Sequence, residues 1–183
     1  MAWRFNHRAS ADLDVFVPED FDAARLADDL SLAGPGLQIT SIADRTIYAV
    51  VEGIPASVLG YRHPSLHPPE RVPELALPLA SPEDLVAMKL AAIGGRSAAK
   101  DFWDLDVMLR GGVCAGELAV ALDVFRKKFP AVDPSHVVRA LAWFGDADVA
   151  PLPRGLAPIA WRQIKERFQQ RVRALFGAAT GGA

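Results

Sequence analysis

A proline-rich stretch in the middle of the sequence places the strongest limit on how this chain can fold. Five prolines lie within residues 62–80: Pro64, Pro68, Pro69, Pro73 and Pro78. Such a density forbids a helix and disfavours a central strand. The stretch therefore predicts an extended loop that joins a strand-rich first part of the chain to a helical second part.

The first part of the chain shows the patterns of β-strands. Residues 12–17 alternate between polar and apolar, which predicts a strand with one face in a core and the other exposed. Further strands are predicted at residues 37–43, 46–52 and 54–61, and Gly53 between the last two indicates a tight hairpin. We therefore expect a mixed sheet of three to five strands.

Helices are predicted from their start and stop signals. One begins at residues 18–20 and stops at Gly34-Pro35-Gly36. After the loop, Ser81-Pro82-Glu83-Asp84 combines an N-cap serine, a proline at the first helical position and acidic residues in the first turn. Further helices are predicted at residues 82–93 (ending at Gly94-Gly95), 97–109, 115–129 and 134–144 (closed by Gly145), and over an amphipathic segment around Trp161 to Leu175.

Composition limits the class of protein. The 183 residues carry a formal net charge of −2, so the chain has no global basic field of the kind that drives non-specific binding to nucleic acid. The single cysteine, Cys114, cannot form an internal disulfide and is expected to be a small, partly buried residue. The N-terminus lacks a signal-peptide core, and no stretch approaches the ~20 apolar residues of a membrane span. We therefore expect a cytoplasmic protein without a membrane partner.

The first candidate site is the acidic strand. Asp12 and Asp14 are separated by one residue, so in a strand both carboxylates project from one face, about 7 Å apart. Two carboxylates placed in this way can bind Mg²⁺, which prefers oxygen ligands and commonly bridges substrate phosphates. Divalent metal supports in-line phosphoryl displacement. An Asp-x-Asp pair alone is a common surface feature, however, and does not assign a function.

The second candidate site is in the helical part. Lys89 lies within an apolar run, so it either extends to the surface or points into a cleft. Arg96 follows, and Asp101 and Asp104 are three residues apart on one face of the next predicted helix. We expect Asp12, Asp14, Lys89 and at least one of these two aspartates to converge on one cleft.

Taken together and in order, these motifs resemble the AbiEii/AbiGii-type toxin family of nucleotidyltransferase-like proteins. The resemblance rests on His7-Arg8-x-Ser10-x-Asp12-Leu13-Asp14, on Tyr61-Arg62-His63-Pro64, on Ser81-Pro82-Glu83-Asp84 with Met88-Lys89-Leu90 and Arg96, and on Lys100-Asp101-Phe102-x-Asp104. It covers residues 5–110 and extends more loosely through the helices beyond.

The resemblance implies an α+β fold, with a nucleotidyltransferase-like mixed sheet and flanking helices followed by a C-terminal helical bundle. On this basis we expect a core at residues 1–78, a helical domain at 79–176 and a flexible tail at 177–183. It implies a toxin that transfers a nucleoside monophosphate from NTP to RNA, including tRNA, or to protein, and that is paired with an antitoxin.

The resemblance also assigns roles to residues. Asp12 and Asp14 are the implied Mg²⁺ ligands and catalytic residues, and Lys89 is the implied contact to the nucleotide phosphates. Asp101 or Asp104 is the implied catalytic acid of the second half. Arg8 and Ser10 support the entrance to the site, and Arg96 is a further candidate for phosphate binding.

Two departures from the family pattern predict weak activity. Nucleotidyltransferases carry a Gly-Gly-Ser/Thr segment before the acidic pair, whose backbone N–H groups hold the triphosphate. Residues 1–11 contain no glycine, and the strand expected at residues 54–61 contains no third carboxylate; Glu52 is the nearest acid and is expected in the hairpin turn. The alternatives are a catalytically inactive nucleotidyltransferase fold that binds an antitoxin or nucleic acid, or a plain α/β domain unrelated to the family.

Overall fold

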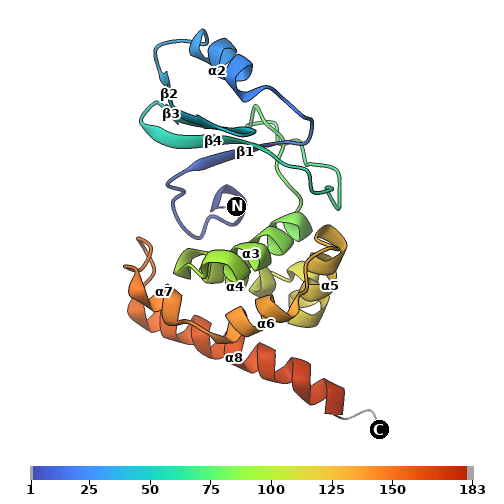
Figure 1. Ribbon diagram of the computed structural model, residues 1–183. Helices are drawn as coiled ribbons and strands as arrows, with labels where there is room; N and C mark the ends of the chain where they lie inside the picture. Colours follow the sequence, from blue (N-terminus) through green and yellow to red (C-terminus); the bar gives the residue numbers. More distant parts are fainter. Residues whose placement is uncertain (1, 181–183) are drawn as a thin grey trace. The chain divides into compact units, whose positions relative to one another are not determined.

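A computed structural model describes residues 2–180, which divide into two compact units. The sheet unit comprises residues 9–64, and the helical unit comprises residues 1–8 together with residues 65–183. The predicted α+β architecture, with a mixed sheet followed by helices, is confirmed (Figure 1).

The sheet unit contains four strands and one helix. The strands are β1 (Leu13–Val17), β2 (Leu37–Ala43), β3 (Thr46–Val51) and β4 (Ile54–Gly60), in the spatial order β1-β4-β3-β2. β1 runs parallel to β4, whereas β4, β3 and β2 are antiparallel neighbours. The predicted hairpin is present, since β3 and β4 pair up to Val51 and Ile54. Glu52 and Gly53 form its two-residue turn, and both have positive φ angles, 50° and 80°, as a turn that matches the twist of the strands requires.

Helix α2 (Ala23–Ser31) covers one face of the sheet and packs on β2 and β3 (Figure 1). Ala23, Ala27 and Ile47 form its small buried core. The predicted start of this helix at residues 18–20 is wrong: the helix begins after Asp22, whose carboxylate accepts hydrogen bonds from the backbone N–H groups of Ala24 and Arg25. An N-cap side chain of this kind outweighs the weaker start signal before it.

The helical unit contains most of the helices. They are α1 (Ala2–Phe5), α3 (Pro82–Arg96), α4 (Ala99–Arg110), the short 3₁₀ helix η1 (Val113–Gly116), α5 (Leu118–Lys128), α6 (Ser135–Ala142), α7 (Gly145–Val149) and α8 (Pro158–Thr180). A large buried cluster joins α3 to α8, with Phe102 in contact with the rings of Phe144, Trp161 and Phe168. The expected tail at 177–183 includes the last residues of α8, and residues 181–183 lie outside the described part of the chain.

The end of α3 differs from the prediction. The helix continues through Gly94 and Gly95 to Arg96, and Ser97 in the left-handed conformation ends it. A Cβ at Gly94 would lie 2.8 Å from Nε2 of His136 on α6. The glycine is therefore a point of close helix packing and not a stop signal.

A buried ion pair ties three segments of the helical unit together. Asp84 in the first turn of α3 accepts a hydrogen bond from Nζ of Lys128 at 2.5 Å, and Lys128 is only 1% exposed. The same carboxylate accepts the backbone N–H of Leu66 at 3.1 Å and the hydroxyl of Ser81 at 2.7 Å. The proline-rich loop, α3 and α5 therefore share one buried anchor.

The single cysteine behaves as expected, and two histidines of the proline-rich stretch face solvent. Cys114 is buried, and burial raises the pKa of its thiol to about 11, so it is not a reactive thiolate at neutral pH. His63 and His67 are both exposed.

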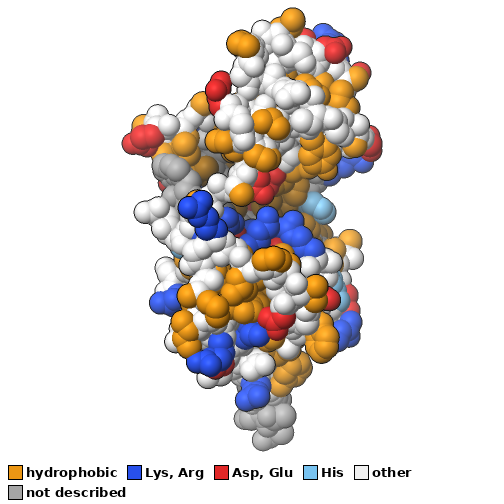
Figure 2. Space-filling view, turned by 90° about the vertical axis from the view of Figure 1, so that its left-hand side faces the viewer, with side chains coloured by type: hydrophobic (Ala, Val, Ile, Leu, Met, Phe, Trp, Pro, Cys, Tyr) orange, Lys and Arg blue, Asp and Glu red, His pale blue; other side chains and the backbone are white. Residues whose placement is uncertain are grey.

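Charge is divided unevenly between the two units. The sheet unit carries 3 Lys and Arg against 9 Asp and Glu, which gives a formal net charge of −6. The helical unit carries 17 against 13, which gives +4. Figure 2 shows Lys and Arg side chains gathered on the face that it draws. The overall charge of −2 therefore hides a basic unit and an acidic one.

Candidate functional site

The acidic strand presents its carboxylates to solvent. Asp12 immediately precedes β1, Asp14 lies within it, and both are exposed. β1 is an edge strand of the sheet, and α2 packs on β2 and β3 instead. The prediction that the apolar face of residues 12–17 lies in a core therefore fails at Leu13, which is 50% exposed.

A serine on the neighbouring strand orients Asp14. Ser57 on β4 is the register partner of Asp14, and its hydroxyl donates a hydrogen bond to Oδ1 of that carboxylate. Ser57 is 8% exposed, so the donor is fixed by its surroundings while the acceptor remains exposed. On the approach to the strand, the hydroxyl of Ser10 donates to the backbone oxygen of Asp12 at 2.9 Å, which shapes the chain there without contacting the Asp12 carboxylate.

No third carboxylate adjoins this pair on β4. The strand reads Ile-Pro-Ala-Ser-Val-Leu-Gly, and Ser57 stands opposite Asp14 where an acid would complete the set. Glu52 lies in the hairpin turn, as expected. Across residues 2–180 there is no group of three or more His, Cys, Asp or Glu side chains placed to hold a metal ion.

In the helical unit, Lys89 joins two buried carboxylates. Asp101 and Asp104 on α4 are both 0% exposed. Nζ of Lys89 on α3 lies 2.9 Å from Oδ1 of Asp101 and 2.7 Å from Oδ2 of Asp104. The shared helical face predicted for the two aspartates is therefore turned towards Lys89.

Each aspartate also contacts further basic side chains. Arg96 donates two hydrogen bonds to Asp101, at 2.8 and 2.9 Å. Arg8 donates two to Asp104, at 2.7 and 2.8 Å. Nε2 of His7 lies 2.7 Å from Oδ1 of Asp104. These contacts form one charge network, which we define as Lys89, Arg96, Arg8, His7, Asp101 and Asp104.

The pKa values of the two aspartates follow from this network. Burial acts to raise the pKa of Asp101, but hydrogen bonds and charge from Arg96 and Lys89 outweigh it and the pKa is lowered. Burial likewise acts to raise the pKa of Asp104, and Arg8, Lys89 and His7 together lower it well below its usual range. Both groups are therefore ionised at neutral pH, and their charge holds the cations in place.

Comparisons with known proteins agree with these observations. Residues 1–179 match the family described as "Nucleotidyl transferase AbiEii toxin, Type IV TA system". The chain belongs to the AbiEii nucleotidyl transferase toxin family. An uncharacterized protein of Aquifex aeolicus, aq_aa25, is 30% identical over 181 residues, which cover 93% of this chain and 81% of that protein. No solved structure matches the chain.

Membership in the AbiEii family confirms the resemblance drawn from the motifs. It implies a nucleotidyltransferase-like toxin of a type IV toxin–antitoxin system, and therefore an antitoxin as its partner. Within the described residues, every helix is too short or too polar to cross a bilayer.

Two residues of this AbiEii-family chain were given no role by the motifs. His7 belongs to the opening motif and is tied to Asp104, which lies 97 residues away in sequence. Ser57 belongs to a strand selected only for its apolar pattern, yet it hydrogen-bonds Asp14. The only sequence signal for His7 was its position beside Arg8, and Ser57 had none, because its role depends on strand register.

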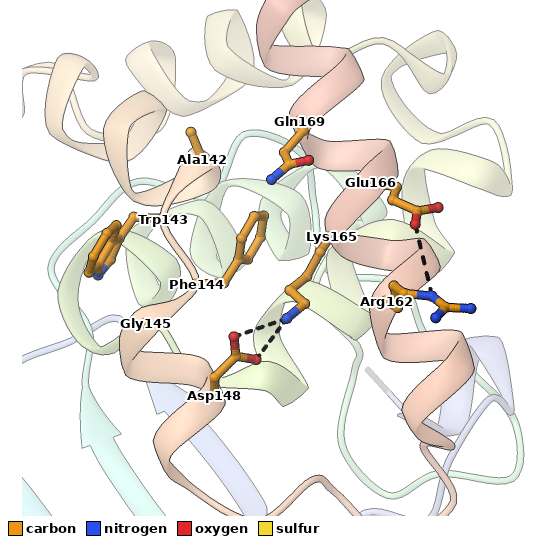
Figure 3. Close-up of a pocket in the computed structure, with 9 residues that line it drawn as sticks. All are labelled: Ala142, Trp143, Phe144, Gly145, Asp148, Arg162, Lys165, Glu166 and Gln169. Carbon is orange, nitrogen blue, oxygen red and sulfur yellow. Dashed lines mark hydrogen bonds and ion pairs between the residues drawn. The ribbon is translucent and has the colours of Figure 1, made fainter.

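A hollow in the helical unit was also not foreseen. It has a volume of about 400 Å³ and lies between the α6–α7 segment and α8 (Figure 3). Its charged side chains are paired: Lys165 binds Asp148 at 2.9 Å, and Arg162 lies 4.0 Å from Glu166. Trp143 at its rim is 64% exposed and its ring lies against Gly145. The hollow is therefore an aromatic and charge-balanced surface, unlike the charge network.

Proposed function

We propose that this chain is a nucleotidyltransferase that transfers a nucleoside monophosphate from NTP to an RNA acceptor, with tRNA as the first acceptor to test and protein as the second. The observation that carries the proposal is the pair of exposed carboxylates at the start of β1, one of which is oriented by the buried Ser57 hydroxyl. Family membership supplies the reaction class.

The carboxylate pair fits Mg²⁺ in chemistry. Asp12 and Asp14 offer oxygen ligands from one side of one strand, and both are exposed. Mg²⁺ keeps several waters and takes oxygens from substrate phosphates, so two carboxylates are enough to bind it with a nucleotide. Bound there, the metal would neutralise the phosphates and promote in-line displacement.

In this proposal Lys89 contacts the nucleotide phosphates. An ammonium has three N–H donors, and Lys89 directs two of them to Asp101 and Asp104. The remaining donor is available for a phosphate oxygen, and the side chain is 16% exposed. Arg96, 57% exposed, is the second proposed phosphate contact, and Arg8 supports the same network.

We assign Asp101 and Asp104 a positioning role. Both are fully buried, and their oxygens accept hydrogen bonds from several cationic groups. A carboxylate in this state can act as a proton acceptor only after its cations leave, which is costly in a buried site. Its contribution to catalysis is to hold Lys89, Arg96 and Arg8 in fixed geometry.

We expect the 183-residue chain to be weakly active. Residues 1–11 contain no glycine-rich phosphate-binding segment, and charge-assisted hydrogen bonds contribute roughly 1.5–3 kcal/mol each. Losing two or three of them weakens nucleotide binding by a few orders of magnitude. Phosphoryl transfer depends on this positioning, so turnover falls with it.

The test is to incubate the purified chain with each labelled NTP, with Mg²⁺ or Mn²⁺ and with total tRNA. The Asp12→Ala/Asp14→Ala variant is the control. Weak transfer or metal-dependent binding that the variant abolishes supports the proposal. Robust transfer that the variant abolishes shows that the glycine-rich segment is dispensable, and equal transfer by the variant contradicts the assigned site.

A second candidate function is a catalytically inactive module that binds its antitoxin or a nucleic acid. The observation that favours it is the exposed Trp143 beside the hollow of Figure 3. Partner binding that survives Asp12→Ala/Asp14→Ala but is lost in Trp143→Ala, with no transfer by either protein, would select this function.

A further inference from the structure

The register of the sheet places Tyr48 on the same face as Asp14. Asp14 on β1 pairs with Ser57 on β4, and Ser57 pairs with Tyr48 on β3. Register partners in a sheet project from the same face. Asp14, Ser57 and Tyr48 therefore form one row across three neighbouring strands.

The row lies on the face of the sheet opposite α2. Ile47, the sequence neighbour of Tyr48, is 0% exposed and packs in the core formed with α2, together with Val58. Because successive side chains of a strand alternate between faces, Tyr48 and Ser57 point away from that helix. Asp14 and Tyr48 thus share the face that α2 leaves uncovered.

The Tyr48 ring is half exposed. Its relative exposure is 46%, and within residues 2–180 it has neither an aromatic neighbour nor a hydrogen-bond partner for its hydroxyl. The exposed part of the ring leaves apolar surface in contact with water in the middle of the sheet. Such a ring offers a flat surface to a planar group, and nucleobases stack on surfaces of this kind.

We propose that Tyr48 is the platform for the base of the nucleotide whose phosphates bind at Asp12 and Asp14. This inference rests on the function proposed above. Two interstrand steps separate Tyr48 from Asp14, about 10 Å, which suits the reach from a phosphate through a ribose to its base. Ser57 between them is small and its hydroxyl already donates to Asp14, so the sugar can pass over it.

A stacking platform also predicts little preference among the four bases. Stacking accepts every base because each one has a π-face, and the Tyr48 hydroxyl has no hydrogen-bond partner within residues 2–180 that would fix it towards one base. The four NTPs should therefore bind with affinities within a few fold of one another through this residue.

The experiment compares two probes in the presence of Mg²⁺: an NTP, tested with each of the four bases, and inorganic tripolyphosphate, which has no base. Tyr48→Ala should weaken NTP binding about tenfold and leave tripolyphosphate binding unchanged. Tyr48→Phe, which keeps the ring, should bind both as the parent chain does. Titration calorimetry gives both affinities, and circular dichroism confirms that each variant is folded.

Ile42→Ala is the matched control. Ile42 is 47% exposed, almost the same as Tyr48, but it pairs with Ile47 and so lies on the α2 face. It should leave both affinities unchanged. Asp14→Ala should weaken binding of both probes, because it removes a metal ligand and not the base platform.

The outcomes separate the two proposals. If Asp14→Ala weakens both probes and Tyr48→Ala weakens neither, the platform is wrong and the metal site stands. If Tyr48→Ala weakens both probes equally, Tyr48 is not a base platform. If Asp14→Ala changes neither probe, or the parent chain binds neither, the proposed metal site fails, and the platform fails with it.

Discussion

The two units of this protein use aspartate in opposite ways. In the sheet unit, Asp12 and Asp14 are exposed, and the unit has a formal net charge of −6. In the helical unit, Asp101 and Asp104 are fully buried, and the unit has a net charge of +4. The same side chain thus faces solvent in one unit, where we propose that it binds a metal ion, and pairs with the protein's own cations in the other.

The two units also differ in the size of their hydrophobic cores. The buried cluster of the helical unit contains 24 hydrophobic residues of the described chain, whereas that of the sheet unit contains three. A fixed charge network needs a rigid support, which many buried contacts provide. The proposed metal-binding carboxylates Asp12 and Asp14 need less support, because a bound Mg²⁺ would take further ligands from substrate and water.

The largest expected effect tests the difference between the cores. Phe102→Ala should lower the free energy of unfolding by about 3–5 kcal/mol, because Phe102 is 0% exposed and contacts three other aromatic rings. Ile47→Ala, also at 0% exposure, should cost only about 2 kcal/mol, because fewer buried neighbours surround it. Urea unfolding measures both. Equal costs would show that the two cores are equally well packed.

The next prediction concerns the charge network. Asp104→Ala removes the partner of Arg8, Lys89 and His7, and breaking a buried ion pair costs about 3 kcal/mol or more. The matched control is Asp123→Ala on α5, whose carboxylate is exposed and pairs with Arg126; it should change stability by less than about 0.5 kcal/mol. Chemical unfolding curves provide the measurement, and a neutral Asp104→Ala would mean that the network is not needed for stability.

The third prediction is a loss of stability in acid. The pKa values of Asp101 and Asp104 are lowered in the folded protein, so the unfolded chain binds protons at higher pH than the folded chain does. The stability that these groups contribute is complete above about pH 5 and falls as the pH drops through and below their unfolded pKa of 3.8.

Unfolding midpoints measured from pH 7 to pH 3 check this prediction. The Asp101→Asn/Asp104→Asn variant should be less stable at pH 7 and should lose less on acidification. A variant with the same acid sensitivity as the parent chain would place the titrating groups elsewhere.

The smallest expected effect on stability belongs to the exposed pair. Asp12→Ala/Asp14→Ala should change the unfolding free energy by no more than about 1 kcal/mol, because both side chains are exposed and the unit loses two charges from an acidic excess. The same variant should lose Mg²⁺-dependent nucleotide binding. A thermal shift assay with and without Mg²⁺ and NTP separates the two effects, and a large loss of stability would make the pair structural.

Much of the fold followed from local patterns. The hairpin around Gly53, the start of α3 at Ser81-Pro82 and the amphipathic α8 each depend on residues close together in sequence. The errors came where packing overrides a local signal. Gly94 reads as a helix stop, but in the structure it allows α6 to approach α3.

By itself, the sequence determined the family of this chain and the place of its acidic strand. The spacing of Asp12 and Asp14 implies one exposed face of a strand, and the order of the motifs implies the AbiEii family, because both are encoded within short segments. Only the tertiary structure decided the partners. His7 and Arg8 meet Asp104, and Ser57 and Tyr48 line up with Asp14, through helix packing and strand register that bring distant residues together. Local periodicity contains no information on such pairings, because they depend on how whole elements fit against one another.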